Sequence, residues 1–138
     1  MPIDVYFNFN GNAREAIAFY ADAFEAEAPA IIRFGDSPPN PDHPLPEEAK
    51  DLVMHANMKI LGSTVMFSDV FPGMAFTVGS NITLSISTND EEQLKRIFHK
   101  LKVGGEVNME LQETFWSKLY GQVTDPYGVL WQLNLGEA

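Results

Sequence analysis

Hydrophobic and polar residues alternate along several short stretches of this chain, as they do in half-buried β-strands. The first stretch lies at the amino terminus, where Ile3, Val5, Phe7 and Phe9 alternate with Asp4, Tyr6 and Asn8. The same alternation, with turn residues between the stretches, predicts strands at 30–34, 52–60 and 64–68. It predicts four more at 81–87, 106–109, 119–124 and 129–135.

Two longer segments repeat apolar residues at helical spacing instead. The first follows Asn12, which is the expected N-cap residue, and Glu15 completes the pattern of a capping box. The second follows TNDEE and places Leu94, Ile97, Phe98 and Leu101 on one face. Each half of the chain therefore has the order strand–helix–strand–strand–strand. This order predicts an α+β fold of two βαβββ modules, about residues 1–70 and 80–138, within one domain of residues 1–138.

A helix packed on a sheet buries the strand face beneath it, so the polar residues of each strand should lie on the opposite face. The helix-covered faces are expected to include Val5, Phe7 and Phe9 in the first module and Ile82, Leu84 and Ile86 in the second. In the strand at 52–60, Val53, His55, Asn57 and Lys59 are expected on the polar face. If each sheet curls around a cavity, these faces form a neutral, amide-rich pocket. Its expected lining is Tyr6, Asn8, His55, Asn57, Asn81, Thr83 and Gln132. A polar face turned simply to water remains the alternative.

Composition and charge narrow the range of partners. The chain has 138 residues and a formal net charge of -10, so nucleic acid and anionic membranes should be repelled. It contains no cysteine, which excludes disulfides, thiolate metal sites and cysteine nucleophiles. No stretch approaches the roughly 20 apolar residues of a membrane span, and the amino terminus lacks the pattern of a signal peptide. We expect a soluble, cytoplasmic protein.

Two side chains, His55 and Trp116, and one loop are further candidates for chemistry or ligand contact. His55 is the histidine on the predicted pocket face; it could act as a general base, although a hydrogen-bonded structural role is commoner for such a residue. Trp116 could stack on a planar ligand that Gln112 orients, or it could fill the core or a dimer seam. The proline-rich segment 35–50 is a long surface loop that could cover a pocket or be mobile.

Four segments together are similar to a known family: YFNFNGNAREAIAFY, VMHANMKI, PGMAFTVGSNITLSI and LQETFWSKLYGQVTDPYGVLWQLN. They resemble the PhnB-like branch of the vicinal oxygen chelate superfamily, which includes glyoxalase I, bleomycin-resistance proteins, fosfomycin-resistance enzymes and extradiol dioxygenases. The resemblance covers essentially the whole chain. It implies two βαβββ modules with curled sheets, pockets inside those sheets, and assembly as a homodimer.

Metal enzymes of the superfamily carry His, Gln or Glu on the first strand of each module and on the last strand. Transferred by strand position, these places fall near Asp4 to Tyr6, on Asn81 and on Gln132. First-row divalent metals prefer imidazole or carboxylate ligands, so Asn81 and Gln132 depart from the metal pattern and no metal ligand is predicted. Methyl transfer, by which some members of the branch are named, is not indicated either, because no strand leads into a glycine-rich nucleotide-binding turn.

The leading hypothesis is therefore a PhnB-like protein that binds a small molecule in an amide-rich pocket between curled sheets, without a predicted cofactor. Whether it is an enzyme remains open. One alternative is a metal-dependent lyase or dioxygenase that uses His55 and an acidic residue. The other is a drug-sequestering protein that resembles the bleomycin-resistance dimers, in which the net charge of -10 would favour a cationic ligand.

Overall fold

The computed structural model describes residues 2–136, and the chain divides into two compact units, unit 1 (Met1–Phe76) and unit 2 (Thr77–Ala138). Unit 1 contains one helix, four strands and two short 3-10 turns, in the order β1 (Val5–Phe9), α1 (Ala13–Ala23), β2 (Ile31–Arg33), η1 (Phe34–Asp36), η2 (Glu47–Ala49), β3 (Val53–Ile60) and β4 (Ser63–Asp69). Unit 2 contains β5 (Thr83–Thr88), α2 (Glu91–Leu101), β6 (Glu106–Gln112), β7 (Tyr120–Thr124) and β8 (Leu130–Leu135). The predicted βαβββ repeat is confirmed.

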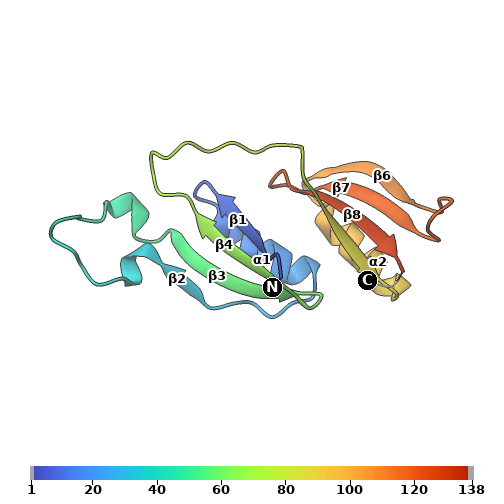
Figure 1. Cartoon of the computed structure of the whole chain (residues 1–138), viewed down its shortest axis with the longest axis horizontal. Helices are drawn as coiled ribbons and strands as arrows, with labels where there is room; N and C mark the ends of the chain where they lie inside the picture. The colour runs from blue at the N-terminus through green and yellow to red at the C-terminus, as the bar shows by residue number, and fades with distance from the viewer. Residues whose placement is uncertain (1, 137–138) are drawn as a thin grey trace. The chain divides into compact units, whose positions relative to one another are not determined.

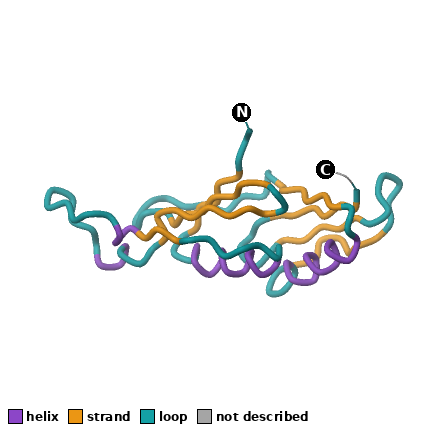
Figure 2. Tube along the Cα trace, turned by 90° about the horizontal axis from the view of Figure 1, so that it is seen from below, coloured by secondary structure: helices purple, strands orange, loops and turns teal. Residues whose placement is uncertain are grey.

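Each unit forms one open four-stranded mixed sheet, and the two sheets have the same topology (Figure 1). The strand order is β1-β4-β3-β2 in unit 1 and β5-β8-β7-β6 in unit 2. The first and last strands of each unit pair in parallel, and the remaining neighbours pair antiparallel. The helix lies along one face of its own sheet in each unit (Figure 2). We call the other face of each sheet the helix-free face.

The core of each unit lies between helix and sheet, where the sequence places it. In unit 1, Tyr20 of α1 is fully buried and stacks on Phe67 of β4 with ring centroids 6.0 Å apart. In unit 2 the predicted stripe of α2 is buried along its whole length, from Leu94 to Leu101. Trp131 of β8 is buried as well, and its indole N–H donates to Asp125 at 2.8 Å. Within residues 2–136, neither helix is long and apolar enough to cross a membrane.

Asn12 is the N-cap residue of α1, as predicted, but its side chain does not supply the expected capping hydrogen bond. Instead Asp69, the last residue of β4, accepts the backbone N–H of Gly11 at 2.9 Å and of Ala13 at 3.0 Å through one oxygen. Its other oxygen accepts the N–H of Val53 at 2.9 Å. A carboxylate distant in sequence thus satisfies the helix start that a local side chain was expected to satisfy.

Two face assignments also differ from the prediction. The pairing of β2 with β3 skips one residue, since Ile32 pairs with His55 and Arg33 with Val53. This bulge turns Val53 into the core, where it is fully buried, instead of onto the polar face. In unit 2 the first strand begins at Thr83, so Ile82 lies before it and is exposed rather than covered by the helix.

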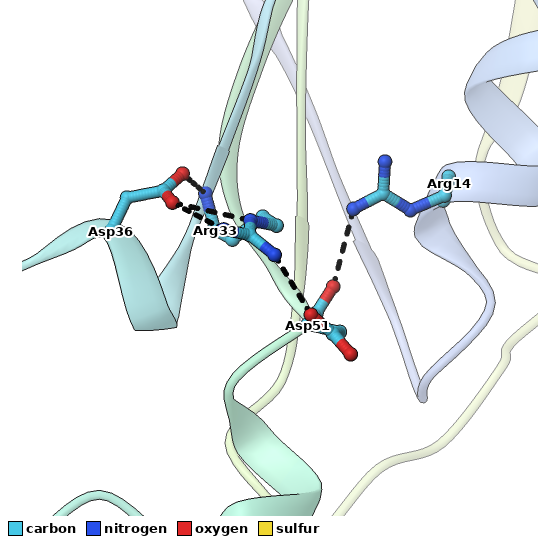
Figure 3. Close-up of polar contacts among 4 residues, drawn as sticks. All are labelled: Arg14, Arg33, Asp36 and Asp51. Atoms are coloured by element: carbon cyan, nitrogen blue, oxygen red, sulfur yellow. Dashed lines mark hydrogen bonds and ion pairs between the residues drawn. The ribbon is translucent and has the colours of Figure 1, made fainter.

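The loop 35–50 is closed at its base. The N–H of Phe34 donates to the carbonyl of Leu52 at 3.1 Å, and the N–H of Gly35 to that of Lys50 at 2.9 Å. A Cβ on Gly35 would lie 2.8 Å from the same carbonyl oxygen, so this approach requires glycine. Beside the base, the Arg33 guanidinium forms 2.8 Å ion pairs with Asp36 and Asp51 (Figure 3).

Candidate functional site

The helix-free face of unit 1 gathers four of the residues predicted to bind a ligand. The register places Asn8 of β1 beside Ser68 of β4, and Tyr6 of β1 beside Met66 of β4. On the other side of β4, Met66 pairs with Asn57 of β3. His55 lies two residues before Asn57 on the same face. Tyr6, Asn8, His55 and Asn57 are thus brought onto one sheet surface by β1 and β3.

Tyr6 and His55 make direct contact across that surface. The Tyr6 hydroxyl and the His55 Nδ1 share a hydrogen bond of 3.2 Å, and the two ring centroids are 5.9 Å apart. The neighbouring pair is also bonded, because the Ser68 hydroxyl donates to Asn8 Oδ1 at 3.2 Å. A phenol hydrogen-bonded to an imidazole offers a ligand both donors and acceptors of hydrogen bonds.

A shallow hollow opens near the C-terminal end of β3. Its volume is about 310 Å³, and it is lined by residues 27–30, which lead into β2, and by Asn57, Met58 and Lys59. Asn57 therefore belongs both to the helix-free face and to a concave region at its edge.

The helix-free face of unit 2 carries two rows of side chains, all polar except Met109. One row runs Ser85, Gln132, Gln122 and Met109 across β5, β8, β7 and β6, and the next runs Ser87, Asn134, Tyr120 and Gln112. Gln132 lies in the middle of the first row, on the strand face opposite the helix. Gln112 is the last residue of β6, and its side-chain amide donates back to the carbonyl of Glu110 at 3.1 Å.

Trp116 lies in the turn between β6 and β7, outside the core. It packs edge-on against Tyr120, with ring centroids 5.3 Å apart, and Phe115 packs edge-on against it at 4.7 Å. Trp116 is 55% exposed and Phe115 is 98% exposed. Trp116 therefore does not fill the core of this unit, which was one of the roles that the sequence left open.

Asn81 is separated from the other candidates. It is exposed and lies two residues before β5 begins, so it occupies no strand face. Thr83, the first residue of β5, is paired with Leu130.

The residues at the superfamily's metal places do not form a metal-binding group. They are Asp4 to Tyr6, Asn81 and Gln132. Asp4 is exposed and lies before β1, and Asn81 lies before β5. Among residues 2–136 there is no group of three or more His, Asp or Glu side chains that could hold a metal ion. This donor set does not fit a first-row divalent metal, which prefers imidazole and carboxylate.

Several residues of the two helix-free faces were not among the predicted site residues. Ser68 and Met66 lie between the predicted residues of β1 and β3, and Ser85, Ser87, Tyr120, Gln122 and Asn134 lie around Gln132. Alternation alone places Ser85 and Ser87 on the same face as Thr83, and Asn134 on the same face as Gln132. Tyr120 and Gln122 required the pairing of β7 with β8, which the sequence does not give.

A family model described as 3-demethylubiquinone-9 3-methyltransferase matches residues 3–134 of the chain. The chain belongs to this family. A relative from Escherichia coli, Protein YjdN, is 35% identical over 144 residues, which cover 98% of this chain and 95% of that protein.

Solved structures agree with this membership. Protein PA1353 from Pseudomonas aeruginosa is 34% identical with a TM-score of 0.82, over 97% of this chain and 96% of that one. A putative 3-demethylubiquinone-9 3-methyltransferase, PhnB protein, from Bacillus cereus is 28% identical with a TM-score of 0.75, over 99% and 100%. The resemblance to the PhnB-like branch is therefore confirmed.

The wider fold likeness extends to the fosfomycin-resistance proteins. A mutant of FosX from Listeria monocytogenes, in complex with Mn(II), has a TM-score of 0.66 at 14% identity, over 99% of this chain and 92% of that one. At this identity the likeness concerns the fold alone. It confirms the predicted glyoxalase/bleomycin-resistance-like architecture of this PhnB-like chain.

Proposed function

We propose that this PhnB-like protein binds a small, uncharged polar molecule on the helix-free face of unit 1. The observation that carries the proposal is the Tyr6–His55 contact of 3.2 Å, with Asn8 and Asn57 on the same surface. These groups offer donors and acceptors and carry no carboxylate among them. A surface of this kind recognises a ligand by hydrogen bonds and shape rather than by charge.

The chemistry of the pair limits the reactions it could support. His55 is the catalytic candidate of the sequence, and its Nδ1 is engaged by Tyr6. That bond fixes the ring orientation and leaves Nε2 as the nitrogen that would meet a ligand. Binding is the function proposed for this surface; proton transfer by His55 would require a substrate seated against Nε2.

The methyl transfer in the family's description is not transferred to this chain. The segment between β1 and α1 contains a single glycine, Gly11. Nowhere in the chain does a strand lead into a helix through the pattern G-x-G-x-x-G that holds a nucleotide-like cofactor. The Mn(II) of FosX is not transferred either, because the corresponding places offer no imidazole and only one carboxylate, that of Asp4, which lies before β1.

The test is a fragment-binding screen followed by nuclear magnetic resonance on the ¹⁵N-labelled protein. We expect hits that shift the signals of Tyr6, His55 and Asn57, and we expect Tyr6→Phe and His55→Ala each to weaken those hits about three- to tenfold, the value of one hydrogen bond. Thr64→Val is the matched control: Thr64 lies on the same face, where its hydroxyl is bonded to Lys59. Equal weakening by all three variants, or hits that leave these signals unmoved, would refute the proposal.

Assembly is a separate part of the proposal. We propose a homodimer, as the family resemblance implies, and light scattering coupled to size-exclusion chromatography should give about twice the chain mass of 15.4 kDa. A mass of one chain at micromolar concentration would exclude it.

A further inference from the structure

The helix-free face of unit 2 contains a buried hydrogen-bond acceptor that nothing satisfies. Asn134 Oδ1 is closed off from solvent and has no hydrogen-bond partner. Within residues 2–136, no other buried side-chain N or O atom lacks a partner. Buried polar groups in folded proteins are almost always bonded, because an unbonded one loses its water and gains nothing in return. An orphan of this kind therefore marks a place where a donor from outside the chain would be stabilised.

The equivalent position in unit 1 shows that the geometry does not force this condition. Asn8 and Ser68 are neighbours on the parallel strands β1 and β4, and Ser87 and Asn134 are neighbours on the parallel strands β5 and β8. In unit 1 the serine hydroxyl donates to the asparagine oxygen at 3.2 Å. In unit 2 the same two residue types, exchanged between the strands, leave the asparagine oxygen unbonded.

An aromatic surface lies beside this acceptor. Tyr120 is the antiparallel neighbour of Asn134, and Trp116 packs against Tyr120 at 5.3 Å. The Tyr120 hydroxyl accepts a hydrogen bond from the Gln122 amide at 3.2 Å, which fixes the phenol. Trp116 nevertheless keeps 55% of its side chain exposed.

The turn that presents Trp116 is held by its own hydrogen bonds. The N–H of Ser117 donates to the Thr114 hydroxyl at 3.1 Å, and the N–H of Thr114 donates to the Ser117 carbonyl at 2.9 Å. The Ser117 hydroxyl then donates to the carbonyl of Leu119 at 2.9 Å. The exposure of the ring is thus built into an ordered turn, and is not a consequence of a loose loop.

We infer that this region, which we call the Asn134 subsite, binds a flat, uncharged ring that carries an N–H group. The N–H donates to Asn134 Oδ1, and the ring packs against Trp116. The ligand is uncharged because the row around the acceptor consists of Ser87, Tyr120 and Gln112, and a charge seated there would be desolvated without a counter-charge. Because the oxygen is closed off from solvent, binding requires a covering side chain to turn aside.

The inference goes beyond the function proposed for unit 1, since it concerns other residues on another sheet. It is tested with two probes that differ at the ring nitrogen, indole, which carries the N–H donor, and 1-methylindole, which carries a methyl group in its place. Titration into the ¹⁵N-labelled protein is followed on the Trp116 indole N–H and the Asn134 side-chain amide. We expect indole to bind wild type about five- to tenfold more tightly than 1-methylindole, the ratio that one buried hydrogen bond gives.

Asn134→Leu removes the acceptor at similar size and should bring that ratio close to one. Asn40→Leu is the control, because it changes a hydrogen-bonded asparagine of the exposed loop 35–50, outside both helix-free faces, and should leave the ratio unchanged. If Asn134→Leu does not fold, the wild-type ratio and the site of the shifts decide the question. Equal affinity of the two probes for wild type, absence of binding at millimolar concentration, or shifts confined to Tyr6 and His55 would each overturn the inference. The last outcome would leave the function proposed for unit 1 intact.

Discussion

Asp69 is the residue whose replacement tests the architecture of unit 1 most directly. It is only 4% exposed, and its carboxylate accepts three backbone N–H groups from two other parts of the unit. Gly11 and Ala13 belong to the start of α1, and Val53 begins β3. One side chain therefore joins the entrance of the helix to two strands of the sheet.

Asp69→Asn changes one oxygen into an NH₂ group at almost constant size. In the better orientation the amide oxygen still accepts the N–H groups of Gly11 and Ala13. The NH₂ group then faces the N–H of Val53, so that two donors meet and no hydrogen bond forms there. One bond to a charged acceptor is lost, and the other two become bonds to a neutral acceptor. With roughly 1.5–3 kcal/mol for a bond to a charged group and about 1 kcal/mol for a neutral one, the expected loss is at least about 3 kcal/mol.

Urea unfolding measures this loss. With a slope of about 2 kcal/mol per molar urea, the midpoint of unit 1 should fall by about 1.5 M. Both tryptophans, Trp116 and Trp131, lie in unit 2, so fluorescence follows unit 2 and the transition of unit 1 must be followed on its own amide signals. Hydrogen exchange supplies the local measurement: the Val53 amide should lose more protection than that of Ala56 on the same strand.

Asp42→Asn is the control, because Asp42 is exposed in the loop 35–50 and should change stability by less than about 0.5 kcal/mol. If Asp69→Asn shifts the midpoint no more than Asp42→Asn does, the three bonds do not stabilise the unit. If the Val53 amide keeps its protection while stability falls, the loss does not come from the bond between Val53 and Asp69.

Three further predictions follow from other contacts. Asp125→Asn should destabilise unit 2 by about 2–3 kcal/mol, read from tryptophan fluorescence in urea, because Asp125 accepts the Trp131 indole N–H at 2.8 Å and the backbone N–H groups of Tyr127 and Val129; an unchanged midpoint would contradict this. The hydrogen bond from the Arg33 side chain lowers the pKa of Asp36, so Arg33→Met should raise that pKa toward its usual value in a carboxyl NMR titration. A carboxyl whose pKa is lower in the folded state stabilises the fold above its unfolded-state pKa, and this stability is lost as the pH falls through its folded-state pKa. Arg33→Met should remove this pH-dependent loss of stability at acid pH. Arg14→Met should affect it little. Elemental analysis of the purified protein should find no stoichiometric zinc, nickel or manganese, and a stoichiometric metal that disappears in His55→Ala would instead favour the metal-dependent alternative.

The element order and the core could be predicted from the sequence because both depend on local periodicity. The stripe of α2 from Leu94 to Leu101 needed only helical spacing, and the buried face of β8 around Trp131 needed only alternation. The face of Val53 could not be predicted in this way. A bulge in the pairing with β2 changes which face a residue occupies, and a bulge depends on the partner strand rather than on the strand's own sequence.

The same difference between local and distant information explains the bonding at the start of α1 and the contrast between Asn8 and Asn134. Asn12 has the right type and place for a helix cap, yet the start of α1 is bonded by Asp69, which lies 56 residues from Ala13. Asn8 and Asn134 are both strand residues on helix-free faces, and no local pattern separates them. What separates them is whether the serine across the parallel pair donates its hydroxyl, which it does for Asn8 and does not for Asn134. Polar alternation can therefore place an amide on a face that could bind a ligand, but only the neighbours decide whether that amide is still available to bind one.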